Sequence, residues 1–283
     1  MQRLLVPVDF SPNSKKAFRY AVDIASKSGG TVILYHLFSP LKATAVGPPF
    51  NTREHNTLLE IKFLKKLQRL KKKVLADTQI KNVTVSTLVA RFPVVKNILR
   101  CAEKNQIDLI VMGTKGATGL KKITVGSNAS KVIKQSEVPV LLIPEKFTWK
   151  KPEKIVFTTT LCKSDNQAFP VLLQLAKLYQ AAVKVVNIRD PHQLYGFKEK
   201  EEFEMYAHSV QRTFDYDNIK FRQLDTFSVS KTMESLSEEI PYDMLIMLRT
   251  KKSFIQKIFL ESFTKSMALI TQKPLMVIPM KKN

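Results

Sequence analysis

The sequence predicts an α/β fold made of two tandem doubly wound domains, each a five-stranded parallel sheet of order 3-2-1-4-5 flanked by helices. Three observations predict it. Each half of the chain alternates short apolar runs with amphipathic runs, the second half repeats the first, and half of the glycines follow one apolar run of the first half. Strands that alternate with helices in this way form right-handed βαβ units, which place the strands in parallel.

An internal duplication divides the chain. Residues 108–144 align without a gap with residues 243–279, and the opening RLLVPVDF aligns with residues 154–161. Self-similarity of this kind indicates that one structural unit occurs twice. We therefore expect one domain over residues 1–146 and a second, degenerate copy over residues 150–283.

Five strands are expected in the first half, because short runs rich in Val, Leu and Ile are typical of strands covered on both faces. These runs are residues 4–8, 31–37, 83–90, 108–112 and 138–143. The second half repeats this order with about 16 fewer residues between its front and rear blocks, as the two alignments show.

Helices are expected between the strands. The first begins at Ser11 or Asn13, both good N-cap residues, and runs to about Lys27. The second includes the basic run 61–74, whose apolar residues recur at helical spacing. The third runs from Pro93 to about Asn105 and the fourth begins near Ser127, while a loop with Pro and Gly surrounds residues 47–50.

Composition bounds the class of protein. The chain has 283 residues, of which 44% are hydrophobic, and no apolar run approaches the ~20 residues that span a bilayer. We expect a soluble cytoplasmic protein. Cys101 and Cys162 lie far apart and fit neither a disulfide framework nor a metal-ligand spacing, so both are expected to be reduced packing residues.

The net charge of +22 suggests binding to nucleic acid or to an anionic membrane surface. The densest basic run, residues 61–74, also carries Phe63, Leu67 and Leu70 on one helical face, so its bases form the outer face of an amphipathic helix. A solvated helix face is the simpler interpretation. No RNA-binding aromatic pattern, zinc-finger spacing or heptad zipper accompanies the charge.

Four of the eight glycines lie between residues 113 and 126. Ligands of open parallel sheets bind beyond the carboxyl ends of the strands, where the strand order reverses. Asp9 ends strand 1 and Gly113 follows strand 4, so we expect both at one crevice. Glycine permits positive φ and close approach of backbone N–H groups to an anion, and Ser127 is expected both to cap the next helix and to donate to a phosphate.

Asp9 is expected to face the nucleoside end of such a ligand. Its carboxylate would repel phosphates but accept hydrogen bonds from ribose hydroxyls or an adenine amine. Turn geometry alone would explain one or two of the glycines. The convergence with Asp9 favours the phosphate-binding interpretation.

The spacing Gly113-x2-Gly116-x9-Gly126-Ser127 resembles the ATP-binding motif of the universal stress protein family. The opening VPVDFS and the YHLF that ends the second run resemble that family's first two strands. The resemblance covers essentially the whole chain and implies a Rossmann-like fold similar to adenine nucleotide alpha hydrolases. Carried over by motif position, it implies nucleotide contacts by Pro7, Val8, Asp9, Leu37, Met112, Gly113, Gly116, Gly126, Ser127, Asn128 and Ala129.

Two positions depart from the family pattern in the first half. Arg91 stands where a glycine is often found, and Ala129 lacks a hydroxyl that some members have. In the second half the motif is lost, and the residues at the positions of Asp9, Gly113, Gly116 and Gly126 are Thr160, Leu248, Lys251 and Glu261. We therefore expect only the first domain to bind ATP, with the second acting as the partner in a pseudo-dimer or offering a different surface.

The functional hypothesis is a stress-response or regulatory protein in which ATP, or AMP or ADP, acts as a conformational or assembly signal. Mg²⁺ or Mn²⁺ would be recruited by the phosphates. The sequence offers no catalytic or metal-ligating constellation, so at most weak ATP hydrolysis is expected. A homodimer or an intramolecular pseudo-dimer is expected. The alternatives are a basic scaffold that binds nucleic acid or anionic membrane, and a slow ATPase.

Overall fold

The computed structural model describes residues 1–40, 52–78, 80, 82–114, 126–189, 196–226, 229–249 and 273–280. The described residues up to Val140 form one compact unit, and those from Leu141 onward form a second. This division falls at the start of strand β5 (Val140–Ile143). The domain bounds expected from the sequence, 1–146 and 150–283, stay a prediction.

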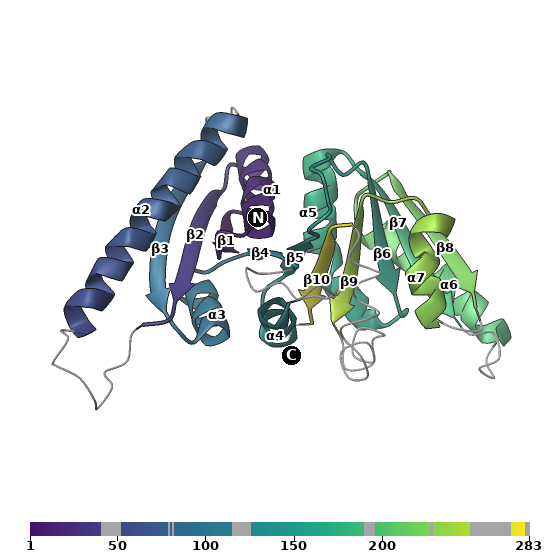
Figure 1. Cartoon of the computed structure of the whole chain (residues 1–283). Helices are drawn as coiled ribbons and strands as arrows, with labels where there is room; N and C mark the ends of the chain where they lie inside the picture. Colours follow the sequence, from purple (N-terminus) through teal and green to yellow (C-terminus); the bar gives the residue numbers. More distant parts are fainter. Residues whose placement is uncertain are drawn as a thin grey trace. The chain divides into compact units, whose positions relative to one another are not determined.

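A parallel sheet forms the centre of the first unit (Figure 1). Its strands are β1 (Arg3–Pro7), β2 (Thr31–Phe38), β3 (Thr84–Arg91) and β4 (Leu109–Gly113), in the order β3-β2-β1-β4, and β5 follows β4 in that order. Pairing of β1 with both β2 and β4 is parallel. The order 3-2-1-4-5 predicted from the sequence is confirmed.

The described residues of the first unit include four helices. They are α1 (Pro12–Ser28), α2 (Thr52–Thr78), α3 (Val94–Lys104) and α4 (Ser127–Gln135). Helix α1 contacts α2, and α3 contacts α4. Right-handed crossovers place these two pairs on opposite faces, because the direction of travel along the sheet reverses between β3 and β4.

The core lies between the sheet and its helices. Leu4, Leu5 and Val6 of β1 are fully buried, as are Phe18 and Ile24 of α1. A strand with helices on both faces has no side exposed to water, which explains why β1 reads as a continuous apolar run. Helix α1 begins as predicted, because the Ser11 side chain accepts a hydrogen bond from the Ser14 N–H.

The second unit repeats the architecture. Its parallel strands are β6 (Lys154–Thr159), β7 (Ala182–Arg189), β8 (Ile219–Asp225), β9 (Met244–Arg249) and β10 (Leu275–Pro279), in the order β10-β9-β6-β7-β8. Its helices are the 3₁₀ helix η1 (Lys163–Gln167), α5 (Phe169–Tyr179), α6 (Gly196–Thr213) and α7 (Val229–Glu239). The segment aligned with α4 lies outside the described residues.

The duplication extends to individual hydrogen bonds. In the first unit the Asp108 carboxylate accepts hydrogen bonds from the backbone N–H groups of Gln2 and Arg3, at 2.6 and 3.0 Å. In the second unit Asp243 accepts from the N–H groups of Glu153 and Lys154, both at 3.0 Å. Each aspartate precedes the strand beside the first strand of its unit and binds the start of that first strand.

The second strand of each unit is also tied to the end of the first strand by a side chain. The His36 imidazole contacts the Val8 carbonyl through Nδ1 at 2.7 Å. At the matching place Asn187 donates from Nδ2 to the Thr159 carbonyl at 3.1 Å. The two units therefore keep the same local architecture even where the residue types differ.

None of the helices in the described part of the chain has both the length and the apolar character needed to cross a bilayer.

Candidate functional site

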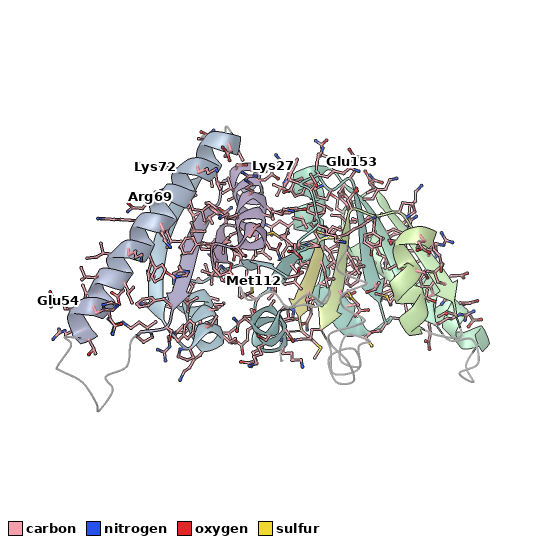
Figure 2. The ribbon with its side chains drawn as sticks, in the orientation of Figure 1. Lys27, Glu54, Arg69, Lys72, Met112 and Glu153 are labelled. Atoms are coloured by element: carbon pink, nitrogen blue, oxygen red, sulfur yellow. The ribbon has the colours of Figure 1, made fainter. Side chains whose placement is uncertain are left out.

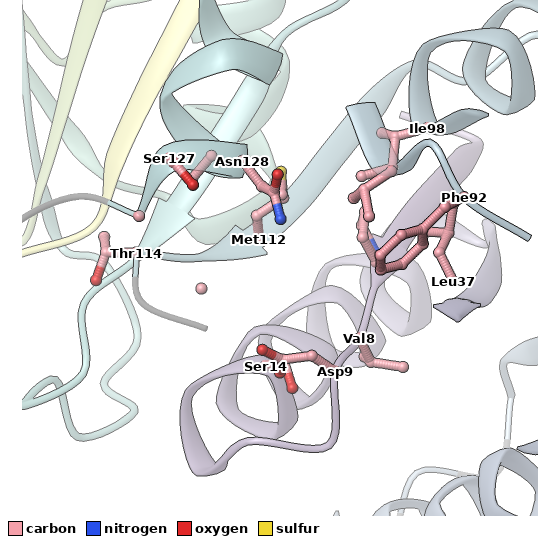
Figure 3. Close-up of a pocket in the computed structure, with 15 residues that line it drawn as sticks. Val8, Asp9, Ser14, Leu37, Phe92, Ile98, Met112, Thr114, Ser127 and Asn128 are labelled. Atoms are coloured by element: carbon pink, nitrogen blue, oxygen red, sulfur yellow. The ribbon is translucent and has the colours of Figure 1, made fainter. Parts of the chain in front are cut away.

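A pocket of about 280 Å³ opens in the first unit beyond the carboxyl ends of β1, β2 and β4 (Figure 3). It lies where the strand order reverses, which is the usual ligand position in open α/β sheets. Its lining residues are Pro7, Val8, Asp9, Ser14, Leu37, Phe92, Val94, Ile98, Met112, Gly113, Thr114, Gly126, Ser127, Asn128 and Ala129.

The structure brings together the contact residues that the sequence predicts, except Gly116, which lies outside the described residues. Segments more than 100 residues apart, such as Asp9 and Gly113, meet at this one pocket. Sequence reasoning missed Ser14, Phe92, Val94, Ile98 and Thr114. Whether the predicted residues contact a nucleotide stays a prediction.

An apolar wall forms one side of the pocket. Leu37, Phe92 and Ile98 lie together there, opposite Ser127 and Asn128 (Figure 3). Phe92 is 49% exposed. Its backbone N–H donates to the Phe38 carbonyl at 3.0 Å, which fixes the start of the β3–α3 connection beside the end of β2.

The residue before this ring, Arg91, is turned toward a different partner. Its guanidinium forms an ion pair with Glu60 of α2, with nitrogen–oxygen distances of 2.8 and 2.9 Å. Arg91 does not line the pocket. Arg91 is exposed and therefore interacts at the surface of the unit.

Asp9 follows β1 and lines a third side of the pocket, next to Val8 (Figure 3). One of its carboxylate oxygens accepts a hydrogen bond from the Ser11 N–H at 3.0 Å, which orients the side chain after β1. The preceding Val8 N–H donates to the Tyr35 carbonyl at 2.8 Å. The turn that carries Asp9 is therefore tied to β2 on one side and to the start of α1 on the other.

His36 does not line the pocket, but it contacts the Val8 carbonyl next to Asp9 and so supports this turn. Its side chain is buried, and Phe10 and Phe63 lie against it with ring centroids 4.6 and 4.4 Å away. Burial is the main reason why the pKa of His36 lies below its usual value; the Val8 carbonyl and Asp9 oppose this lowering, and Lys66 adds to it. A neutral ring with a proton on Nδ1 donates to Val8, which indicates a structural role.

Gly113 is needed for a reason that the sequence did not reveal. A Cβ atom at this position would lie 2.8 Å from Cγ and Nδ2 of Asn13, on the first turn of α1. Among the described glycines only Gly29 has positive φ, so neither Gly113 nor Gly126 uses the left-handed conformation that glycine permits. Close approach of α1 to the end of β4 explains Gly113 instead.

The N-terminus of α4 forms the remaining side of the pocket. Gly126 is the N-cap residue with φ −58° and ψ 149°, and no side chain caps the helix. The expectation that Ser127 caps it is therefore wrong, because Ser127 is already the first helical residue. The N–H groups of the first turn lack partners within the helix, and the helix dipole adds positive potential there.

Gly126 also joins this helix to β4, since its N–H donates to the Thr114 carbonyl at 2.5 Å. Thr114 is held in turn by Asn13, whose Nδ2 contacts Thr114 Oγ1 at 3.4 Å. The first turn of α4 and the end of β4 thus form one connected edge of the pocket. Ser127 and Asn128 are both exposed at that edge.

The matching place in the second unit is filled differently. Asp165 is 1% exposed there, and its carboxylate accepts hydrogen bonds from Thr159 Oγ1 and the Thr160 N–H. Burial is the main cause that raises the pKa of Asp165. Leu248, aligned with Gly113, is also buried, while Lys251 and Glu261 lie outside the described residues.

No group of three or more His, Cys, Asp or Glu side chains that could hold a metal ion occurs among the residues that the structure describes. Of the pocket residues that the structure describes, Asp9 is the one that contributes a carboxylate. A divalent cation in this pocket would therefore need phosphate oxygens of a ligand to complete its coordination.

Comparison with known proteins places the chain in a family. The family model described as "Universal stress protein family" matches residues 1–144. A universal stress protein of Methanocaldococcus jannaschii is 34% identical over 154 residues, which are 54% of this chain and 84% of that protein. The Bacillus subtilis universal stress protein YxiE is 29% identical over 148 residues, 50% of this chain and 97% of that protein.

The fold of the whole chain also has a counterpart. A solved universal stress protein of Archaeoglobus fulgidus matches 99% of this chain and 97% of its own, with a TM-score of 0.64 and 18% identity. At that identity the match supports the fold alone. The family model and the two curated relatives carry the assignment, and the chain belongs to the universal stress protein family.

Proposed function

We propose that the first unit binds an adenine nucleotide, ATP or its products ADP and AMP, and that the bound state acts as a regulatory signal in a stress response. The observation that carries the proposal is the composition of the pocket. An apolar wall, a single carboxylate and an open helix N-terminus line three different sides of one cavity. These three surfaces match a base, a ribose and a phosphate chain.

The base fits the apolar wall. Leu37 and Phe92, with the buried Ile98 behind them, offer an apolar surface on which an adenine ring can pack, and the half-exposed Phe92 would gain burial on binding. Asp9 then lies within the pocket at the nucleoside, where its carboxylate can accept hydrogen bonds from ribose hydroxyls.

The phosphates fit the opposite edge. Ser127, Asn128 and Ala129 of the first turn of α4 line the pocket, and helix N-termini bind phosphate through the N–H groups of that turn. Keeping Asp9 at the nucleoside end separates its charge from the phosphates. Small-molecule pockets range from ~300 to ~1,000 Å³, so a cavity of about 280 Å³ suits a compact ligand such as a nucleoside with its phosphates at the rim.

The decisive experiment places a negative charge where the phosphates are expected. Ser127→Asp should weaken ATP binding at least about tenfold, because the new carboxylate occupies the helix N-terminus that the phosphates need. The same charge is favourable for α4 itself, so the fold should not suffer. Isothermal titration calorimetry with ATP and Mg²⁺ measures the affinities of the variant and the wild type.

The matched control is Thr52→Asp, which also exchanges a hydroxyl for a carboxylate at a helix N-terminus of the same unit. Thr52 begins α2 and does not line the pocket. The control should bind ATP like the wild type. Equal affinities for wild type and Ser127→Asp would refute the phosphate position, and no heat with the wild type would refute the nucleotide itself.

The regulatory part of the proposal is that nucleotide stabilises one conformation or assembly state. Binding shifts such an equilibrium only if the two states differ in nucleotide affinity. Sedimentation velocity with and without ATP tests whether a homodimer forms and responds to nucleotide. Phosphate release above the blank rate in the presence of Mg²⁺ or Mn²⁺ would add a slow ATPase activity to this function.

A further inference from the structure

A second cavity, of about 540 Å³, lies between α1 and α2 on the first unit. It does not share a lining residue with the nucleotide pocket. We call it the basic groove. Its lining residues are Phe10, Pro12, Lys15, Lys16, Arg19, Lys66, Arg69, Leu70, Lys73 and Val74.

The groove has an apolar floor and cationic walls. Leu70 and Val74 are buried at 8% and 1% exposure, whereas Lys66, Arg69 and Lys73 stand exposed on the same helix. Six of its lining residues are lysine or arginine, and none of those that the structure assigns to it is acidic. Arg19 also forms an ion pair with Asp77 at 2.6 Å, which leaves the cations in large excess.

Helix periodicity produces this arrangement. On α1 the lining residues fall at positions 12, 15, 16 and 19, and on α2 at 66, 69, 70, 73 and 74. Each set occupies one helix face, so two basic faces meet along a common line. Such a concentration of like charge is unfavourable in itself, because neighbouring cations repel each other. A polyanion in the groove would relieve that repulsion.

The basic surface continues along α2. A neighbouring hollow is lined by Leu58, Ile61, Lys62 and Lys65 and shares Lys66 and Arg69 with the basic groove. From Leu58 to Lys73 the helix rises about 22 Å at 1.5 Å per residue. Figure 2 shows Arg69 and Lys72 on this helix. The cations thus form an elongated track, which suits a linear polyanion better than a single phosphate.

We propose that the basic groove binds the sugar-phosphate backbone of single-stranded nucleic acid. Phe10 supports this choice of ligand. It lines the groove and is half-buried, and the Lys66 ammonium lies 5.6 Å from its ring centroid. Sequence-independent binding of single strands combines such a cationic track with an aromatic ring on which a base stacks.

A bilayer surface fits less well. Leu58 and Ile61 are the large apolar side chains that α2 exposes within the described residues, at 60% and 44%. An interfacial helix buries a whole apolar face in the membrane, and the apolar face of α2 is already occupied, with Leu67, Leu70 and Val74 buried in the protein. A flat surface also cannot enter a groove.

The test compares the wild type with a charge-reversed groove. Lys66→Glu, Arg69→Glu and Lys73→Glu are combined, and binding of a fluorescent oligothymidylate of about 20 nucleotides is followed by anisotropy over a range of KCl concentrations. Affinity at low salt should fall at least about tenfold. The slope of log K against log salt should become shallower by about two, since each phosphate contact contributes ~0.7.

The matched control carries Lys96→Glu, Arg100→Glu and Lys104→Glu on α3. It makes the same change in composition and net charge at exposed positions outside the groove. The control should lose less than about threefold in affinity, because long-range charge is screened within a Debye length. Equal losses in both triple variants would overturn the proposal, since net charge alone would then explain binding. Thermal unfolding of both variants verifies that they are folded.

Phe10→Leu tests the single-stranded ligand specifically. Leu161 occupies the matching position of the second unit with φ 58°, against 65° for Phe10, so leucine is compatible with this backbone. The variant should bind the oligothymidylate about three- to tenfold more weakly, as expected for one lost stacking contact, while a duplex of equal length binds the wild type and the variant alike.

Two other results would overturn the choice of ligand. One is equal binding of single strand and duplex with no effect of Phe10→Leu. The other is tight binding to vesicles containing phosphatidylserine that depends on the groove cations, with no binding of the oligothymidylate. Inorganic polyphosphate serves as a competitor, and at equal phosphate concentration it should displace the labelled strand less well than unlabelled oligothymidylate does.

Discussion

At the scale of single residues, Gly113 shows how a motif glycine can serve packing. The sequence assigns it to phosphate approach, whereas the structure shows that the Asn13 side chain fills the space where its Cβ would lie. Both roles are compatible, because the same close approach of α1 also shapes the pocket. A substitution at Gly113 therefore changes stability as well as any ligand contact.

Gly113→Ala should lower the free energy of unfolding by about 1–3 kcal/mol, the usual cost of an added group in a packed core. Combining it with Asn13→Ala should cost less than the sum of the two single changes, because the second change removes the atoms that the methyl group meets. Urea denaturation of the three variants provides the cycle. Strict additivity would show that Asn13 is not what excludes a side chain.

His36 is a residue near the pocket for which a pH dependence of folding stability can be predicted. Burial lowers the pKa of His36 in the folded protein, with Lys66 in the same direction and Val8 and Asp9 in the opposite one. The unfolded chain then takes up this proton at about pH 6.5, before the folded chain does. Stability should therefore fall as the pH drops below about 6.5, and the loss should end below the folded pKa.

His36→Asn should remove that part of the pH dependence and keep the fold. Asparagine makes the equivalent bond in the second unit, from Asn187 to the Thr159 carbonyl. Between pH 7.5 and 5 the wild type should lose more stability than the variant, as measured by urea denaturation at each pH. Parallel curves for the two proteins would mean that His36 does not titrate differently in the folded state.

The sequence does not identify the apolar residues that line the pocket. Phe92 and Ile98 belong to the β3–α3 segment, and no spacing relates them to the glycine motif. Apolar residues at helical spacing on α3 indicate only a buried face. Phe92 and Ile98 reach the pocket because the β3–α3 connection is fixed beside β2 by the hydrogen bond from the Phe92 N–H to the Phe38 carbonyl. This is a tertiary contact, which the sequence does not show.

At the scale of elements, the first strand of each unit begins with the same hydrogen-bond pattern, in which one aspartate accepts two backbone bonds. Asp108 and Asp243 accept two backbone hydrogen bonds each, at the starts of β1 and β6. Lys150 adds an ion pair with Asp243 at 3.1 Å. The alignment of Asp108 with Asp243 is visible in the sequence, but their partners are not, because those lie about 90 to 106 residues away.

Asp108→Ala and Asp243→Ala should each cost about 1–3 kcal/mol of stability, since two backbone donors lose their acceptor. The effect should be local. Hydrogen exchange should accelerate at Gln2 and Arg3 in the first variant and at Glu153 and Lys154 in the second. Accelerated exchange at the same strand in both variants would contradict the prediction that each aspartate stabilises only its own unit.

For helix α4 the sequence predicts the start of the helix but not its cap. Its start near Ser127 is predicted correctly, because Gly-Ser after a loop is a strong boundary signal. Its capping is predicted wrongly by one position, since sequence alone does not decide which residue leaves the helical conformation. The residues of the first turn that line the pocket are the same under either assignment.

At the scale of the whole molecule, the duplication explains most of what could be predicted. Repeated alternation of strands and helices gives the sheet order, and loss of glycines from the second copy gives the expected difference in function. The basic groove was not foreseen. The sequence shows the charge of the run 61–74, but only the packing of α1 beside α2 brings Lys15, Lys16 and Arg19 to it.

The asymmetry between the copies leads to the broadest prediction. ATP at about 100 times its dissociation constant should stabilise the unit that binds it by about 2.7 kcal/mol, because only the folded state binds. Hydrogen exchange with and without ATP should show added protection around Asp9, Gly113 and Ser127. Matching positions at Thr160 and Leu248 should stay unchanged, since a buried carboxylate and a buried leucine occupy that place. Protection at Thr160 and Leu248 without any at Asp9 would mean that the nucleotide binds the second unit and not the first. Equal protection in both units would contradict the predicted difference between them.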